Sequence, residues 1–183
     1  MGYNGRKIYI IAAVDKNWAI GYKNKLLISI PDDMKQFMQA TTDGVCIMGK
    51  GTLLSLPAGK PLKNRVNIVL THDDKFREEG VVTVHSVDEA LEKLSAYNGD
   101  VYVIGGESIY EQFLPYADEA FITYIDYKYQ ADRHFPNLDE NSQWKMVAES
   151  EEQTYFNVEY YYRKYMRVEQ SGQVRFNSLS PSI

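Results

Sequence analysis

Apolar runs and helix-like patterns alternate along most of the chain. Residues 8–14 (IYIIAAV) form a continuous apolar run, which is typical of a central strand covered on both faces. Further apolar runs predict strands over residues 45–48, 66–70, 81–84, 101–104 and 120–125. Residues 15–29 show neither pattern and are predicted to form a loop with a turn at Gly21.

Helical patterns fall between these strands. Pro31 suits the first turn of a helix, and Met34, Phe37 and Met38 follow at the i, i+3 and i+4 spacing of an apolar stripe. Further helices are predicted at the following places: a short stretch ending near Pro57, a helix opened by the capping-box spacing of Ser86 and Glu89, and a helix after Gly106.

The C-terminal part differs from the rest. Residues 144–168 predict an antiparallel pair of strands, whereas residues 169–183 are polar and aperiodic and are predicted to be a disordered tail. Residues 1–168 therefore form one predicted domain of the α/β class. We expect a mostly parallel central sheet with an antiparallel C-terminal edge, helices on both faces, and ligands at the carboxyl ends of the strands.

Composition narrows the classes of function. The chain has 183 residues, of which 44% are hydrophobic and 25% charged, as in an ordinary globular domain. The formal net charge of −5 argues against a general nucleic-acid surface, so any anionic ligand needs local basic residues. The single cysteine, Cys46, excludes an internal disulfide. No apolar stretch is long enough to span a membrane and no secretory signal pattern is present, so we expect a cytoplasmic protein. We also expect a monomer, although nothing in the sequence reveals the oligomeric state.

Two glycine turns could bind phosphate. A strand that passes through Gly105 and Gly106 into a helix directs unpaired backbone N–H groups at one spot, although such a turn can also serve packing alone. The turn at residues 49–52 (GKGT) would add a second backbone contact with the same dinucleotide. Lys50 could pair with a phosphate, and Thr52 could contact it or act only as a helix cap. Neither turn has the spacing of the three-glycine dinucleotide fingerprint or of a Walker loop.

Asp33 is the candidate acid. It lies one helical turn before Phe37, on the edge of the apolar stripe, while Asp32 points toward water. Both acids could simply favour the helix start, but a carboxylate held against an apolar wall would also be a useful acid and hydrogen-bond partner. Arg65, at the entry to a strand, could be solvated or could clamp a carboxylate.

Six short motifs occur in a fixed order along the chain. They are IAAVD at residues 11–15 leading to Ile20-Gly21, IPDDM at 30–34, IMGKGT at 47–52, PLKNR at 61–65, IGG at 104–106 with Tyr110, and ITYID at 122–126. In this order the motifs resemble those of dihydrofolate reductase over about residues 7–167. The resemblance implies that 7,8-dihydrofolate is reduced to tetrahydrofolate with NADPH, by hydride transfer to the pterin C6 and protonation at N5.

The resemblance also implies roles for individual residues. Asp33 would be the catalytic residue, bound to the pterin N3 and 2-amino group, with Thr123 as its partner. The full substrate site would be Ile11, Ala13, Asp33, Phe37, Leu56, Arg65 and Thr123, with Arg65 on the glutamate α-carboxylate. The cofactor site would be Ala13, Ile20, Gly21, Gly49, Lys50, Gly51, Thr52, Thr71, His72, Ile104, Gly105, Gly106, Glu107, Ser108, Ile109 and Tyr110. Dihydrofolate and antifolates would be the partners, with no metal.

The chain departs from the family pattern at two places. Ile28 occupies the position of a usual tryptophan that helps to hold an ordered water near the pterin, which puts that water in doubt. Lys50 and Gly51 replace a frequent arginine-containing pair, so the preference for the cofactor's 2′-phosphate is weaker or supplied elsewhere. Two alternatives are a pyrimidine reductase of riboflavin synthesis, which would lack the acid at Asp33, and a binding protein without turnover.

Overall fold

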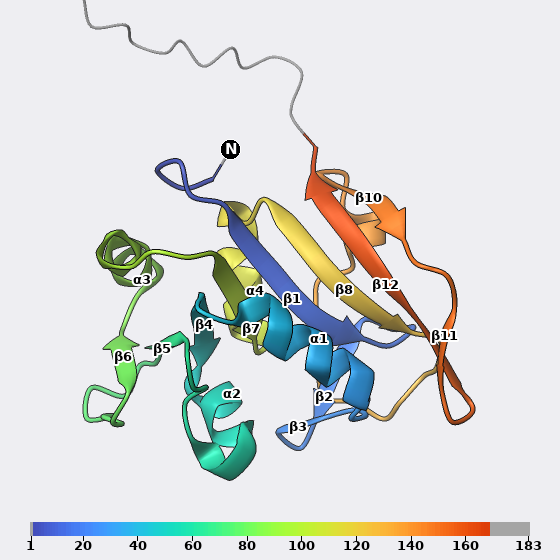
Figure 1. The fold of residues 1–183 in the computed structure, drawn as a ribbon, viewed down its shortest axis with the longest axis horizontal. Helices are drawn as coiled ribbons and strands as arrows, with labels where there is room; N and C mark the ends of the chain where they lie inside the picture. Colours follow the sequence, from blue (N-terminus) through green and yellow to red (C-terminus); the bar gives the residue numbers. More distant parts are fainter. Residues whose placement is uncertain (1, 169–183) are drawn as a thin grey trace, which may run out of the picture.

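The computed structural model describes residues 2–168 of the chain (Figure 1). The predicted tail at residues 169–183 lies outside this range. The predicted α/β class is confirmed: a mostly parallel sheet carries an antiparallel edge and is flanked by helices.

One large sheet forms the centre of the molecule. Its strands are β1 (Ile8–Val14), β4 (Val45–Gly49), β5 (Val66–Leu70), β6 (Val81–Val84), β7 (Val101–Gly105), β8 (Glu119–Ile125), β10 (Trp144–Glu149), β11 (Gln153–Tyr155) and β12 (Val158–Arg167). They lie in the order β10-β12-β8-β1-β7-β4-β5-β6, with β11 paired to β12. The pairs from β8 through β6 are parallel, and those of β12 with β8, β10 and β11 are antiparallel. The predicted antiparallel pair at residues 144–168 is thus three strands.

Helices cover both faces of this sheet. They are α1 (Pro31–Thr41), α2 (Lys50–Ser55), α3 (Val87–Lys93) and α4 (Glu107–Phe113), with short 3-10 helices at Pro57–Gly59, Leu94–Ala96, Leu114–Tyr116 and Leu138–Glu140. In Figure 1, α1 crosses in front of β1 and α4 lies behind the sheet. The side chains of α3 and α4 pack into one core with the buried side of β1, while α2 packs with β4 on the other face.

Burial along β1 explains its uniform hydrophobicity. Ile8, Ile10 and Val14 are fully buried, but Ile11 and Ala13, which face α1, are only partly buried. The sequence predicted that both faces of this strand are covered. The second face is only partly buried because it lines a cleft. The apolar side chains on that face are therefore available to a ligand.

The predicted loop at residues 15–29 was wrong in part. It contains β2 (Ala19–Tyr22) and β3 (Lys25–Leu26), which form a small antiparallel sheet with β9 (Arg133–His134). These strands are short, and β2 also pairs with a segment more than 100 residues away, which periodicity cannot reveal. The pairing holds Ile20 and Gly21 beside the sheet.

The capping box is confirmed in one half only. Ser86 Oγ accepts a hydrogen bond from the Glu89 backbone N–H at 3.0 Å, as predicted. The Glu89 carboxylate accepts instead from the His85 N–H, at 2.8 Å, one residue before the expected donor. Both bonds still satisfy N–H groups at the start of α3.

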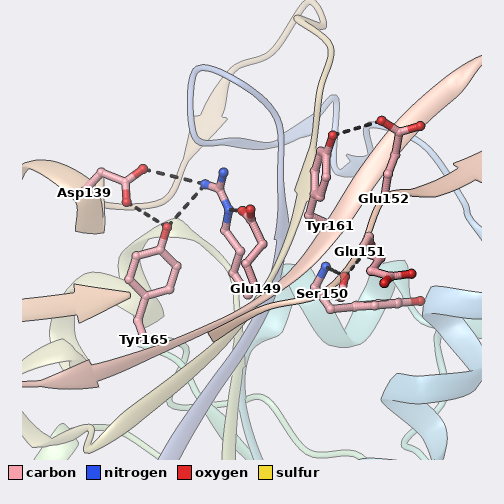
Figure 2. A network of polar contacts seen from close by, with 9 residues as sticks. Asp139, Glu149, Ser150, Glu151, Glu152, Tyr161 and Tyr165 are labelled. Atoms are coloured by element: carbon pink, nitrogen blue, oxygen red, sulfur yellow. Dashed lines mark hydrogen bonds and ion pairs between the residues drawn. The ribbon is translucent and has the colours of Figure 1, made fainter. Parts of the chain in front are cut away.

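A polar network fixes the antiparallel edge (Figure 2). The Arg163 guanidinium lies 2.5 Å from Glu149 Oε2 and 3.7 Å from Asp139 Oδ2, and it stacks on the Tyr124 ring at 3.8 Å. The Tyr165 hydroxyl donates to Asp139 Oδ1 at 2.8 Å. These contacts tie β10 and β12 to β8 and to the 3-10 helix that holds Asp139.

Candidate active site

Two clefts meet where the parallel strands end. One has a volume of about 680 Å³ and largely apolar walls, and the other has a volume of about 750 Å³ and more polar walls. We call them the apolar cleft and the polar cleft. They share the wall residues Leu26, Thr52, Ser55, Ile104 and Tyr110. Ligands in the two clefts can therefore touch each other along this wall.

The apolar cleft lies against α1 and β1. Six of the seven residues predicted for the substrate line it: Ile11, Ala13, Asp33, Phe37, Leu56 and Thr123. Asp33 is the only acidic side chain among the described residues that line this cleft. The cleft thus offers a flat apolar molecule one anionic partner, with Arg163 and Lys164 as the cationic residues of its wall.

Asp33 is held by its neighbour across the cleft. It lies in the first turn of α1, and the Thr123 hydroxyl of β8 donates to Asp33 Oδ1 at 2.6 Å. Burial raises the pKa of Asp33 above its ordinary value of 3.8, and the hydrogen bond from Thr123 opposes this rise. Asp32, one residue earlier, is exposed. The predicted division between the two aspartates is therefore visible in their burial.

Thr123 reaches Asp33 because of the strand register. Residues Ala13 of β1 and Thr123 of β8 are partners in the parallel pair, so both lie at the same level of the sheet. Thr123 is only 7% exposed, and Ala13 lies beside it with a small side chain. The small residue leaves room for a ligand between the sheet and α1.

Arg65 lies outside the walls of both clefts. Its Nε donates to Thr41 Oγ1 at 3.0 Å, and its other nitrogens donate to the Met38 and Lys63 carbonyls and to Thr42 Oγ1. Met38 does line the apolar cleft. Arg65 is therefore fixed against the C-terminal turn of α1, one residue away from the cleft wall.

The polar cleft gathers most of the residues predicted for the cofactor. Those that line it are Ile20, Gly21, Gly49, Gly51, Thr52, Thr71, His72, Ile104, Gly106, Glu107, Ser108, Ile109 and Tyr110. Ala13 lines the apolar cleft instead, and Lys50 and Gly105 line neither. Thus 13 of the 16 predicted residues come together here, from four separate segments.

The position of Gly105 requires glycine. Its φ of +116° is rarely adopted by other residues, and a Cβ there would lie 3.0 Å from the Tyr110 ring. The buried Tyr110 hydroxyl lies 2.8 Å from both the Ile11 and the Ile104 carbonyl oxygens, and its single hydrogen can be donated to either. Burial raises the pKa of Tyr110, so the hydroxyl stays protonated. Gly105 and Tyr110 thereby set the wall that separates the two clefts.

The rim of the polar cleft carries an ion pair. Lys50 Nζ lies 2.9 Å from Asp73 Oδ2, and the bond from Lys50 holds the pKa of Asp73 below its ordinary value. The parallel pairing of Gly49 with Leu70 brings the two segments together. Thr71 and His72, which line the cleft, directly precede Asp73.

Sequence reasoning missed several residues of the two clefts. In the apolar cleft these include Leu26, Met34, Met38, Pro57, Leu62 and Tyr162, and in the polar cleft Asn24, Lys25, Leu70, Gln112 and Arg133. The apolar stripe of α1 could have indicated Met34 and Met38. Nothing local indicates Arg133, because it reaches the polar cleft through the pairing of β9 with β2.

Neither a metal cluster nor a membrane-spanning helix occurs in the described chain. Over residues 2–168, no group of three or more His, Cys, Asp or Glu side chains is arranged to hold a metal ion. Within the same range no helix is both long and apolar enough to cross a membrane.

Known proteins resemble this chain over most of its length. The family model for dihydrofolate reductase matches residues 7–167. The dihydrofolate reductase of Buchnera aphidicola is 39% identical over 76% of this chain and 85% of its own length. The Bacillus subtilis enzyme is 38% identical over 77% and 82%, respectively. A solved structure, dihydrofolate reductase from Enterococcus faecalis complexed with NADP(H) and RAB-propyl, has a TM-score of 0.81 at 30% identity, covering 89% of this chain and 97% of that one.

Proposed function

The chain belongs to the dihydrofolate reductase family, and on that premise we propose how its residues divide the work of the reaction. The enzyme reduces 7,8-dihydrofolate to tetrahydrofolate with NADPH. We assign the apolar cleft to dihydrofolate and the polar cleft to NADPH. The observation that carries this assignment is the partly buried Asp33–Thr123 pair, in an apolar cleft that shares a wall with a polar one.

The residues of the polar cleft fit a dinucleotide. The cleft has room for an extended molecule, its wall is formed by glycine turns that let a ligand approach the backbone, and Lys25, Arg133 and His72 supply positive charge or hydrogen-bond donors. A Cβ at Gly49 would lie 3.2 Å from the Ile109 side chain, a tight contact that favours glycine at this position. When bound, NADPH supplies the hydride for pterin C6. The residues of this chain hold the two ligands against the common wall.

Asp33 orients the pterin in this assignment. Its carboxylate can accept hydrogen bonds from the N3 and 2-amino group of the pterin, while Thr123 holds it in place. Phe37 and Leu56 enclose the rings, and Ile11 and Ala13 support them from β1. A carboxylate bound to N3 and the 2-amino group is not expected to touch N5, so we propose that a water molecule carries the proton to N5. Ile28, which packs near Ile30 and Tyr160, supplies no polar group for that water.

Arg65 is assigned to the glutamate tail of the substrate. The guanidinium stands at the C-terminal end of α1, near Met38 in the cleft wall, and it already makes hydrogen bonds that fix its plane. In this assignment the planar guanidinium exchanges some of these bonds for a carboxylate, whose two oxygens match its fork geometry. A cytoplasmic, monomeric enzyme that binds antifolates in the apolar cleft also remains our prediction.

Oxidation of NADPH by the purified protein tests the proposal. We expect it to depend on dihydrofolate and to stop when methotrexate or trimethoprim is added. Binding of both ligands without oxidation of NADPH would indicate a binding protein, the alternative without turnover, and would contradict the proposal.

A further inference from the structure

The ion pair of Lys50 and Asp73 is built on fixed supports. Asp73 Oδ1 accepts from the Lys75 N–H at 3.0 Å, and the Asp73 N–H donates to Thr71 Oγ1 at 3.1 Å. Lys50 Nζ, in turn, lies 5.2 Å from the centre of the Phe76 ring. The carboxylate therefore cannot swing away from Lys50 without breaking its own turn.

The pair lies where a charged end of the cofactor would meet the protein. Lys50 stands between Gly49 and Gly51, and Asp73 directly follows Thr71 and His72; these four neighbours all line the polar cleft. Lys50 and Asp73 themselves remain 39% and 43% exposed. An incoming phosphate thus finds the ammonium of Lys50 already paired with a fixed carboxylate.

We propose that Asp73 is a specificity-determining residue that competes with the cofactor's 2′-phosphate for Lys50 and so limits the preference for NADPH over NADH. The inference rests on the proposed assignment of the polar cleft to the cofactor. The phosphate must share the ammonium of Lys50 with Asp73, which already lies 2.9 Å from it. Exposed ion pairs are weak, so the expected effect is about two- to fivefold. An acid at this position therefore lowers, rather than raises, affinity for the physiological ligand.

The test compares two ligands that differ only by the 2′-phosphate. Adenosine 2′,5′-bisphosphate and 5′-AMP are titrated calorimetrically into the wild type and into Asp73→Asn. Asparagine can still accept from the Lys75 N–H through Oδ1, so the turn is kept. We expect the ratio of the two affinities to rise about two- to fivefold in Asp73→Asn. Asp74→Asn is the matched control: it removes the same charge one residue further on, where no ion pair with Lys50 exists, and should leave the ratio unchanged.

Lys50→Ala separates this inference from the proposed function. If Lys50 serves the 2′-phosphate, Lys50→Ala lowers the affinity ratio, and Asp73→Asn no longer raises it in the Lys50→Ala background. An unchanged ratio in Lys50→Ala would remove Lys50 from the 2′-phosphate site and overturn the inference, whereas failure of both ligands to bind the wild type would overturn the assignment of the polar cleft. A lowered ratio in Lys50→Ala together with no change in Asp73→Asn would overturn the role of Asp73 alone. A gain from Asp73→Asn that persists without Lys50 would overturn the competition.

Discussion

The apolar and polar clefts each involve an aspartate, and the two aspartates differ in almost every physical respect. Asp33 is largely buried, accepts from one hydroxyl, and has its pKa raised by burial. Asp73 is exposed, pairs with a lysine, and has its pKa lowered by that lysine. Desolvation makes the charge of Asp33 costly and sensitive to a ligand, whereas water screens the charge of Asp73. Large effects are therefore expected in the apolar cleft, and modest ones at the rim of the polar cleft.

Asp33→Asn should have the largest effect. Asparagine keeps the size of the side chain but carries no charge, so pterin orientation and help with protonation are both lost. We expect the turnover rate at neutral pH to fall by about 10²–10⁴-fold, with partial recovery at lower pH, where solvent can protonate N5. Steady-state rates from about pH 5 to pH 9 measure this. Asp32→Asn, on the exposed side of the same helical turn, is the control and should cost only about 0.3–1 kcal/mol in stability. A large loss of activity in Asp32→Asn would mean that the reactive acid lies on the exposed face of α1, and it would contradict the role of Asp33.

The same variant should gain stability while it loses activity. Since the pKa of Asp33 is raised in the folded state, the folded protein loses stability as the pH rises from the ordinary value of 3.8 through the raised pKa. The Asp33→Asn variant has no charge to bury and does not lose this stability. Its thermal midpoint should therefore exceed that of the wild type at neutral pH and match it near pH 3.8. Scanning calorimetry at both pH values checks the sign. A lower midpoint at neutral pH would mean that the charge stabilises the fold.

Arg65→Ala should weaken substrate binding selectively. Loss of a charged hydrogen-bond donor to the glutamate tail is expected to cost about 1.5–3 kcal/mol in dihydrofolate affinity. NADPH affinity should change little, because Arg65 is remote from the polar cleft walls. Equilibrium titration of each ligand distinguishes the outcomes. Equal losses for both would show that Arg65 only supports α1 through Thr41 and Met38.

Gly105→Ala tests the wall between the clefts. The φ of +116° and the 3.0 Å approach of an added Cβ to Tyr110 both oppose a side chain, so we expect a loss of about 1–3 kcal/mol in the free energy of unfolding. Urea denaturation measures it. Gly51→Ala is the control, because its Cβ would meet nothing closer than Asn24 Oδ1 at 3.4 Å.

Lys50→Ala should have the smallest effect of the four. The Lys50 side chain is 39% exposed, so the NADPH-to-NADH preference should narrow only about two- to fivefold. Added salt should narrow the preference of the wild type in the same direction, since an exposed phosphate contact is screened. The preference is measured as the ratio of the kcat/KM values for NADPH and NADH, in the wild type and in Lys50→Ala, at low and at high salt. A salt-independent ratio would place the phosphate contact elsewhere.

The sequence predicted features that depend on local pattern and missed those that depend on distant pairing. The strands at residues 8–14, 66–70 and 81–84 coincide with β1, β5 and β6 because continuous apolar runs mark buried strands. The strand β2 was missed because it pairs with β9, over 100 residues away, and β3, which pairs only with β2, has just two residues.

The same division holds for the two clefts. The position of Asp33 on the apolar edge of α1 follows from helical spacing, so its partial burial could be predicted. The pairing of Lys50 with Asp73 depends on the register of β4 against β5, and the hydrogen bonds of Arg65 depend on where α1 ends. Neither is encoded in any local pattern.

Direct titration of the Asp33 carboxyl group by NMR tests the central claim most directly. In the wild type without ligand, the account predicts a pKa above the ordinary value of 3.8, because burial disfavours the charge. In Thr123→Val the pKa should rise further, since the hydrogen bond at 2.6 Å favours the charged form and is lost. A wild-type pKa at or below 3.8, or a fall in Thr123→Val, would contradict it.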